Sequence, residues 1–368
     1  MGSLKKSNEH SQKADLILSN GTIFSGISFG ADKSIAGEVV FNTGMVGYPE
    51  AFTDPSYRGQ ILVLTYPLIG NYGVPGKQIE NGLLKNFESD RIHIAGLVIC
   101  DYSSEYSHWN SEKSLGDWLK EEGIPAIQGV DTRMLTKKLR EKGVMLGKLE
   151  VNGKIDFDDP NKKNLVDEAS CKKPIVYNDG QRTKILLIDG GVKYNIIRSL
   201  VQRNVTVIRV PWDYDFFNFD FDGVIISNGP GDPKMCKTTI KNIARVIDEK
   251  IPIFGVCLGN QLLALAAGAD TYKLKYGHRS QNQPCREIGT MKCYITTQNH
   301  GFAVDTKTLP KGWKPWFENV NDGTNEGIMH ESGRYYSVQF HPEATPGPVD
   351  TSFLFDRFLE TVEKFRKK

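Results

Sequence analysis

A cysteine between two glycines is the first residue of this sequence whose type and spacing could do chemistry. Cys257 lies in the run Gly255-Val256-Cys257-Leu258-Gly259, between an apolar stretch typical of a buried strand and one typical of a helix. With Cys in the Ser position, this is the G-x-nucleophile-x-G pattern of a sharp strand-to-helix turn. The turn places the sulfur at a helix N-terminus, whose partial positive charge favours a thiolate. The pattern indicates a nucleophile, although a free cysteine in an apolar run is more often a packing residue.

A thiolate nucleophile requires an imidazole as acid and base and a carboxylate that orients the imidazole. The run 335–343 supplies both, because an apolar strand precedes His341, Pro342 and Glu343. We expect this strand to deliver His341 at its end. The competing histidines are His278, His300 and His330. We expect His300 in a polar loop at 298–302, after a strand at 293–297, and favour His341 because it has a carboxylate beside it at a turn.

A glycine-rich run follows another predicted strand, at 223–227. It reads Ser227-Asn228-Gly229-Pro230-Gly231-Asp232-Pro233. Its glycines would let backbone N–H groups approach a ligand, and could complete an oxyanion hole with the amide of Leu258. A plain turn is the alternative interpretation.

Alternating elements position these residues in the second half. Apolar runs predict strands at 185–189, 205–210, 223–227 and 252–256, and helices at 193–203, 238–249 and 261–268. Such alternation predicts a mainly parallel sheet flanked by helices, over residues 184–368. Ligands bind outside the carboxyl ends of the strands in sheets of this kind, where the cysteine and the glycine-rich run both fall.

The first half predicts a separate mixed α/β domain over residues 15–155. Strands are expected at 16–18, 38–41, 60–64 and 95–100, and helices at 114–122 and 131–142, the second capped by Asp131. The polar run 156–183 is expected to be an interdomain linker or a surface excursion, and residues 1–14 a disordered tail. Composition alone assigns this first domain no function.

Composition limits the classes of function. The 368 residues are 39% hydrophobic and 24% charged, with 46 basic and 44 acidic residues, which fits a soluble globular protein and gives no electrostatic case for nucleic acid or an anionic membrane. The six cysteines form no C-x-x-C pair, so neither a metal site nor a disulfide framework is expected. A reducing compartment follows, and we expect a cytoplasmic location, or a mitochondrial one if a presequence has been removed.

Together these residues resemble the class I glutamine amidotransferases. The resemblance continues into the first half, where EVVFNTGMVGYPEAFTDPSYRGQILVLTYPLIGNYG and VDTRMLTKKLREKG, like SNGPGDP in the second half, are similar to the small subunit of carbamoyl-phosphate synthetase. It covers about 16–365 and is close to the glutaminase region of the animal multifunctional enzymes of pyrimidine synthesis. GIMHES and TPGPVDT are more similar to the relatives of the urea-cycle type.

The resemblance implies a role for each matching residue. Cys257 would attack the side-chain amide of glutamine, His341 would act as acid and base, and Glu343 would orient it. Gly229 and Leu258 would donate backbone N–H groups to the oxyanion. The positions that would hold glutamine are Ser56, Gly231, Gln261, Asn299, Gly301 and Phe302.

The resemblance also implies a partner. Ammonia would pass to a carbamoyl-phosphate synthetase large subunit, or to C-terminal ATP-grasp domains, which use ATP and bicarbonate. No cofactor is expected in this chain. Ser56 would reach the site from the first domain, and Lys193 matches a lysine near the site.

Two positions depart from the family pattern. Asn260 replaces the His of G-[IV]-C-L-G-H-Q, a change also found in urea-cycle relatives that lack the cysteine. Asp189-Gly190-Gly191 stands where many relatives have D-C-G or D-F-G. Two alternatives stay open: a glutaminase for another pathway, such as anthranilate or GMP synthesis, and a weakened scaffold that mainly stabilises its synthetase. The first domain argues against the former, and only Asn260 favours the latter.

Overall fold

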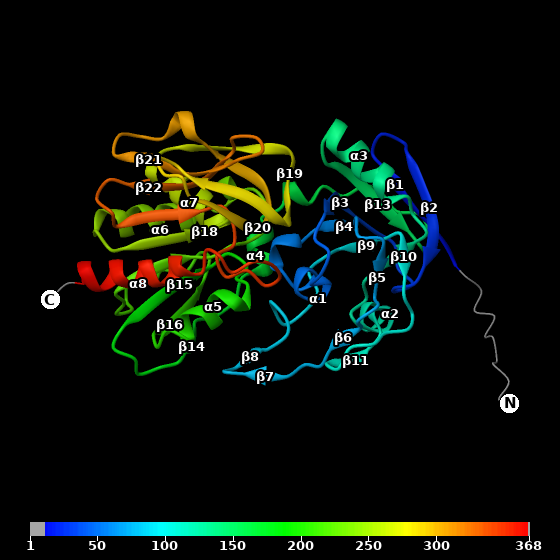
Figure 1. Cartoon of the computed structure of the whole chain (residues 1–368), viewed down its shortest axis with the longest axis horizontal. Helices are drawn as coiled ribbons and strands as arrows, with labels where there is room; N and C mark the ends of the chain where they lie inside the picture. The colour runs from blue at the N-terminus through cyan, green and yellow to red at the C-terminus, as the bar shows by residue number, and fades with distance from the viewer. Residues whose placement is uncertain (1–11, 367–368) are drawn as a thin grey trace.

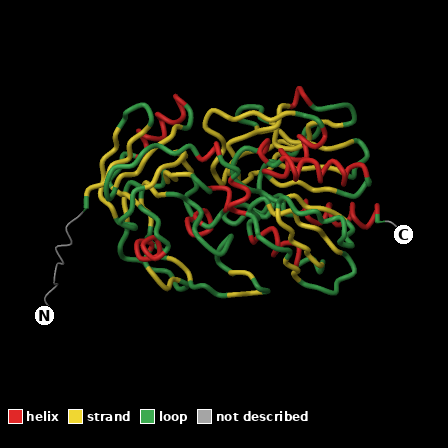
Figure 2. Tube along the Cα trace, turned by 180° about the vertical axis from the view of Figure 1, so that it is seen from behind, coloured by secondary structure: helices red, strands yellow, loops and turns green. Residues whose placement is uncertain are grey.

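β-branched and other apolar runs in the first half of the chain form strands that close into a barrel. The computed structural model describes residues 12–366, and Figure 1 shows the barrel beside a second lobe built on a larger sheet. Strand β1 lies at one end of the long axis and helix α8 at the other, which the view from behind repeats (Figure 2). Of the predicted tail 1–14, residues 1–11 lie outside the described range. Lys13 and Ala14 belong to β1, so there the prediction was wrong.

The first lobe has its strands in the barrel order β1-β13-β3-β4-β9-β12-β2. The barrel strands are β1 (Lys13–Leu18), β2 (Ile23–Ser28), β3 (Ile35–Asn42), β4 (Gln60–Leu64), β9 (Gly96–Val98), β12 (Ala126–Gln128) and β13 (Met145–Glu150). Short strands pair outside it: β5 (Leu68–Ile69), β6 (Val74–Pro75), β7 (Ile79–Glu80), β8 (Leu83–Leu84), β10 (Asp101–Tyr102) and β11 (Ser111–Lys113). The helices are α1 (Tyr48–Phe52), η1 (Pro55–Tyr57), α2 (Leu115–Glu121) and α3 (Thr132–Lys142).

Alternate side chains of the barrel strands enter two different cores. On β4, Ile61 and Val63 join one cluster with α3, whereas Leu62 and Leu64 join the cluster that α1 and α2 cover. This is the period of two that a strand buried on both faces requires. Asp131 caps α3 by accepting a hydrogen bond from the amide of Met134, which confirms the predicted helix start.

The second lobe is a ten-stranded sheet of order β14-β16-β15-β17-β18-β23-β22-β21-β19-β20. Its strands are β14 (Ile175–Tyr177), β15 (Lys184–Asp189), β16 (Thr206–Pro211), β17 (Gly223–Ile226), β18 (Ile253–Val256), β19 (Asp270–Glu287), β20 (Cys293–Asp305), β21 (Trp313–Asn319), β22 (Asn325–His330) and β23 (Tyr335–Val338). Its helices are α5 (Tyr194–Val201), η3 (Pro233–Met235), α6 (Lys237–Asp248), α7 (Leu258–Ala267), η4 (Thr306–Thr308) and α8 (Phe353–Phe365).

Helices cover both faces of the central strands. Ile185 and Leu187 of β15 pack in one core with α5 and α8, while Leu186 and Ile188 pack in another with α6 and α7. Strands buried on both faces are typical of parallel α/β sheets, and β16, β15, β17, β18 and β23 are parallel as expected. Antiparallel strands extend the sheet on both sides, so the fold is mixed α/β.

The long ribbon β19–β20 differs from the expectation. Residues 298–302, predicted as a polar loop, lie inside β20 and pair with β19, Asn299 opposite Arg279. The prediction was wrong because polar residues interrupt the apolar alternation that marks a strand, while the backbone pairing is unaffected.

The polar run 156–183 is not an extended linker. It contains η2 (Pro160–Lys162), α4 (Leu165–Ala169) and β14, which pairs with β16 at the edge of the second sheet. Pro160 and Leu165 are buried, because Pro160 packs beside Gly59 of the first lobe and Leu165 beside Gly231 of the second. Few apolar residues are enough to dock this segment between the lobes.

No helix within residues 12–366 combines the length and the apolar character that a membrane span requires.

The turn after β18 depends on two glycines because backbones touch there. A Cβ on Gly255 would lie 2.5 Å from the carbonyl oxygen of Gly259, and a Cβ on Gly259 would lie 2.1 Å from that of Ile226 on β17. Helix α7 therefore begins in direct contact with the two strands beneath it.

We predict that Gly259→Ala lowers the free energy of unfolding by at least about 2 kcal/mol, since α7 must move away from β17 to admit a methyl group. Urea unfolding followed by circular dichroism measures this change. Ala267→Gly, at the end of the same helix, is the control and should cost no more than about 1 kcal/mol. Wild-type stability of Gly259→Ala would contradict the close contact.

Candidate active site

The carboxyl ends of the parallel strands bring the predicted residues to one edge of the sheet. Gly229 follows β17, Cys257 follows β18, and His341 comes three residues after the end of β23. The observed strand β23 is therefore shorter than predicted, since it ends at Val338 and not at His341. The amide of His341 instead donates to the carbonyl oxygen of Thr297 on β20, at 2.9 Å, which ties this segment to the ribbon.

Cys257 has a backbone conformation that few non-glycine residues adopt. Its φ is 55° and its ψ is −101°, and its amide donates to the carbonyl oxygen of Val338 at 2.8 Å. The side chain is buried. Its thiol lies 3.7 Å from the carbonyl oxygen of Asn299, and the Nε2 of Gln339 donates to Sγ at 3.6 Å. The thiol is thus held at the N-terminus of α7, as predicted.

His341 and Glu343 form a buried pair next to this thiol. The Nδ1 of His341 lies 2.6 Å from Glu343 Oε1, and its Nε2 has no hydrogen-bond partner within residues 12–366. Burial lowers the pKa of His341, but the charges of Glu343 and of a Cys257 thiolate outweigh burial and raise it to about 10. Burial raises the pKa of Glu343, while Lys193 and His341 lower it to about 2. The carboxylate therefore fixes Nδ1–H as a donor and leaves Nε2 for proton transfer.

His300, the main competitor, has both ring nitrogens occupied. Nδ1 lies 2.8 Å from the carbonyl oxygen of Phe302, and Nε2 lies 3.1 Å from Gln298 Oε1. Burial, followed by the charge of His278, holds the pKa of His300 well below its usual range. An imidazole with a lowered pKa and an oxygen atom close to each ring nitrogen is a poor acid–base group, which favours His341.

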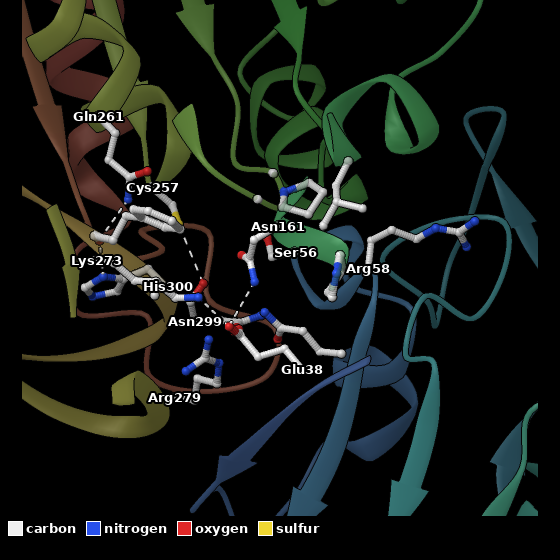
Figure 3. A pocket seen from close by; sticks show the side chains of 18 residues that line it. Glu38, Ser56, Arg58, Asn161, Cys257, Gln261, Lys273, Arg279, Asn299 and His300 are labelled. Carbon is white, nitrogen blue, oxygen red and sulfur yellow. Dashed lines mark hydrogen bonds and ion pairs between the residues drawn. The ribbon is translucent and has the colours of Figure 1, made fainter. Parts of the chain in front are cut away.

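A pocket between the lobes collects the predicted binding residues around the thiol (Figure 3). Of the residues predicted from the sequence, those lining it are Cys257, Ser56, Gly229, Gly231, Gln261, Asn299, Gly301 and Phe302. Leu258 is not among the lining residues; it follows Cys257 as the first residue of α7. Neither the amide of Gly229 nor that of Leu258 has a hydrogen-bond partner in the described part of the chain, so both are available to a ligand oxygen.

A buried polar cluster joins the two lobes at this pocket. Asp54 accepts hydrogen bonds from the amide of Ser56 at 2.9 Å and from Asn299 Nδ2 at 3.0 Å. Asn228 Nδ2 donates to Ser56 Oγ at 3.0 Å. Ser56 therefore reaches the second lobe as the resemblance implied, and it is held there from both sides.

Gln339 connects the thiol to Asn260 and Gln261, three and four residues after Cys257, on the first turn of α7. Its Oε1 accepts from Asn260 Nδ2 and from Gln261 Nε2, each at 3.1 Å. Asn260 also accepts from Ser337 Oγ at 2.8 Å. The Asn260 side chain is fully buried and reaches the thiol indirectly, through Gln339, while the Asn260 amide donates to the carbonyl oxygen of Cys257 at 3.0 Å. The side chain that departs from the family pattern is thus separated from the thiol by one intervening side chain.

The second departure has a packing explanation. A Cβ on Gly190 would lie 3.0 Å from the Leu258 side chain and 3.1 Å from the carbonyl oxygen of Asn228, and Gly191 has a φ of 120°. Glycine at these positions leaves space beside the loop that carries Gly229.

Sequence reasoning missed several charged and polar residues of the pocket. Arg279 is buried there, and burial lowers its pKa below the usual value although the charges of Glu38, Tyr57 and Cys257 oppose this shift. Figure 3 shows Glu38 with Lys273, and the two form an ion pair of 2.5 Å between the lobes. Gln339 and Asp54 were missed as well. Asp54 had a local signal, since it lies in a turn sequence, but its partners lie far away in the chain.

The buried cluster His278, His300 and Glu326 could offer metal ligands, since one atom from each lies within 4.8 Å of the others. Its members are already paired: His278 Nε2 lies 2.8 Å from Asp322 and Nδ1 lies 3.3 Å from Glu326. A metal ion would have to displace these contacts, so the arrangement fits an ion-pair network better.

Comparison with known proteins matches both lobes. A family model described as glutamine amidotransferase class-I matches residues 186–361. With the cysteine turn and the buried His–Glu pair, the second lobe is a class I glutamine amidotransferase domain. A model described as carbamoyl-phosphate synthase small chain, CPSase domain, matches residues 16–149. The chain belongs to the carbamoyl-phosphate synthase family and corresponds to its small chain.

Three relatives illustrate the similarity. The multifunctional protein CAD of Squalus acanthias is 56% identical, over 94% of this chain and 16% of its own length. The multifunctional protein pyr-3 of Neurospora crassa is 53% identical, over 95% of this chain and 21% of its own. The human mitochondrial carbamoyl-phosphate synthase [ammonia] is 53% identical, over 96% and 24%. The chain therefore spans about a quarter or less of each relative.

We predict a pH-dependent contribution of His278 to stability. Burial lowers its pKa, but the hydrogen bonds and charges of Asp322 and Glu326 raise it from 6.5 to about 9. A raised folded-state pKa stabilises the fold fully below pH 6.5, and this stabilisation is lost as the pH rises through 9. The difference in unfolding free energy between wild type and His278→Gln should shrink over this window by on the order of 3 kcal/mol. A difference that does not vary with pH would contradict the prediction.

Proposed function

We propose that this chain hydrolyses glutamine to glutamate and ammonia, with Cys257 as nucleophile, His341 as acid and base and Glu343 as its orienting partner. The observation that carries the proposal is the placement of the Cys257 thiol, strained at a helix N-terminus, in an interdomain pocket beside a buried His–Glu pair. Each of these features is what thiol-based acyl transfer requires.

The reaction has two steps. The Cys257 sulfur attacks the side-chain carbonyl carbon, and His341 protonates the leaving nitrogen as the C–N bond breaks, which releases ammonia and leaves a thioester. A water molecule then attacks the thioester while the neutral His341 takes its proton. The C–S bond breaks, glutamate leaves, and the thiolate–imidazolium pair is restored. The amides of Gly229 and Leu258 would stabilise the oxyanion in both steps.

The ammonia would serve carbamoyl phosphate synthesis. The small-chain domain and the names of the relatives support this destination, and both support a synthetase partner or domain that consumes ATP and bicarbonate. No cofactor is proposed for this chain. A cytoplasmic location stays a prediction, because the human relative is named as mitochondrial.

A scaffold that only supports its synthetase is the second candidate. The human relative named for ammonia is as similar, at 53%, as the Neurospora multifunctional protein, so identity does not separate the two candidates. The geometry favours the glutaminase, because Asn260 makes its hydrogen bonds without disturbing the thiol or the His341–Glu343 pair.

We predict that Cys257→Ser lowers glutamine hydrolysis at least about a thousandfold, because an alkoxide is much harder to form than a thiolate. Glutamate release by the purified chain measures the loss. In a complex with a synthetase, free ammonium should restore carbamoyl phosphate synthesis by this variant. A failure of ammonium to do so in an assembled complex would show that Cys257 is needed for more than glutamine hydrolysis.

Ser56→Ala tests the contribution of the first lobe. We expect the KM for glutamine to rise more than kcat falls, since Ser56 would bind the substrate and the transition state equally. Steady-state kinetics of glutamate release measures both constants. An unchanged KM would mean that Ser56 only holds Asn228.

A further inference from the structure

A buried glutamate of the first lobe lies behind the proposed catalytic pair and has no role in the mechanism above. The amide of Glu88 donates to Thr53 Oγ1 at 2.9 Å, within the first lobe. Its carbonyl oxygen accepts from the amide of Tyr194 at 2.8 Å, at the start of α5 in the second. The backbone of Glu88 thus joins the two lobes, and its side chain is fully buried.

The Glu88 carboxylate binds the first turns of α5. Oε2 accepts from the amide of Asn195 at 3.1 Å, and Oε1 pairs with Arg198. Burial raises the pKa of Glu88 to about 7, against Lys193 and Arg198, which lower it. Removing a carboxylate from water costs free energy. Its attraction to a buried cation offsets this cost only when hydrogen bonds also satisfy its oxygen atoms, as they do at Glu88. This placement calls for an explanation beyond general stability.

The same part of α5 holds the chain segment that follows the proposed acid–base histidine. Asn195 Nδ2 donates to the carbonyl oxygen of Glu343 and to Thr345 Oγ1, the latter at 2.7 Å. Lys193 Nζ lies 3.1 Å from Glu343 Oε1 and donates to the carbonyl oxygen of Ala344 at 2.5 Å. Ala344 and Thr345 have φ values of 58° and 48°. Non-glycine residues hold such conformations only with support from their surroundings.

We propose that Glu88 is a positioning residue for glutamine hydrolysis, acting through α5 on the His341–Glu343 pair. The inference rests on the proposed function. It adds that the first lobe orients the acid–base group, besides binding substrate through Ser56. Without the negative charge at position 88, Arg198 loses its carboxylate partner and keeps the acceptors Asn195 Oδ1 and the carbonyl oxygens of Leu84 and Phe87. The Asn195 amide then faces a neutral and weaker acceptor, so the support of the segment at 343–345 becomes looser.

The charges around the pair determine how the pH profile should respond. Glu88 faces the cations Lys193 and Arg198 and the carboxylate of Glu343. Lys193 also faces Asp54, and Glu50 of α1 faces both cations. The groups that act on His341 itself include Glu343 and Cys257, and His341 in turn acts on His300. Removing one negative charge here makes the surroundings more positive, so the imidazolium should lose its proton at a lower pH.

The test is Glu88→Gln in the full 368-residue chain, with glutamate release measured across pH. We expect kcat to fall about tenfold or more while KM stays within about threefold, because the acid–base group is displaced and the binding residues are not. The alkaline limb of the kcat profile should also move to lower pH, by roughly half a unit to one unit. A merely structural role would not move that limb.

Asp356→Asn is the matched control. Asp356 on α8 pairs with Arg203 just beyond the other end of α5, at 2.7 Å, so this variant breaks a carboxylate–arginine pair away from the pocket, one whose carboxylate is exposed and not buried. Its kcat, KM and pH profile should equal those of the wild type. Thermal unfolding of both variants reports whether they fold.

Asn195→Ala supplies a second line of evidence, because it removes both bonds to the segment but keeps the Glu88 carboxylate and its Arg198 partner, which loses only the Asn195 Oδ1 acceptor. It should lower kcat. The kcat of the double variant Glu88→Gln/Asn195→Ala should lie within about threefold of the kcat of the less active single variant, because both substitutions interrupt the same connection from Glu88 to the segment at 343–345. If Glu88→Gln does not fold, Asn195→Ala decides alone, and a wild-type kcat there overturns the proposal.

Two results would overturn the role of Glu88: a wild-type kcat and alkaline limb in Glu88→Gln, or an effect confined to KM. Both presuppose that the wild-type chain hydrolyses glutamine and that Cys257→Ser does not. If the wild type releases no glutamate, or Cys257→Ser releases as much, then the proposed function itself has failed. The two failures are thereby distinguished.

Discussion

The structure depends on holding one non-glycine residue in a left-handed backbone conformation between a strand and a helix. At φ 55° and ψ −101°, Cys257 costs on the order of 1–3 kcal/mol relative to a relaxed residue. The surroundings offset this cost through the hydrogen bond of its amide to Val338 and through backbone contacts that exclude any side chain at Gly255 and Gly259. The result is a sulfur at the carboxyl edge of the sheet, where Asn299 of β20 and Gln339 after β23 contact it.

The first lobe completes the site that the second begins. The second lobe carries the thiol and the His341–Glu343 pair. Asp54 and Ser56 of the first lobe bind Asn299, which lines the pocket, and Asn228 beside it. Such contacts are buried, so each donor needs its partner, and displacing the lobes would leave several polar groups unsatisfied at once. Relative placement of the lobes is therefore part of the chemistry of the site.

Local patterns in the sequence were enough for the central elements. Apolar runs of the right length predicted β15, β17 and β18, and the G-x-C-x-G spacing predicted the cysteine turn, because both depend on neighbouring residues only. The ribbon β19–β20 was predicted only in part, as a strand at 293–297, because the rest of it is held by pairing between distant backbones. Glu88, Arg279 and Glu326 were missed for a related reason: a buried charge is tolerated through partners far along the chain, which no local period reveals.

Asn299 contacts both the thiol of the second lobe and a carboxylate of the first lobe. Its carbonyl oxygen accepts the thiol of Cys257 within the second lobe, while its side-chain Nδ2 donates to Asp54 of the first. In the proposed mechanism the thiol leaves that carbonyl oxygen to exchange a proton with His341 Nε2, which has no hydrogen-bond partner within residues 12–366. Asp54 binds Asn299, and we propose that Glu88 supports the segment after His341, so both ends of the proposed proton transfer are linked to the first lobe. A change in the contact between the lobes would alter the distance between thiol and imidazole without touching either side chain.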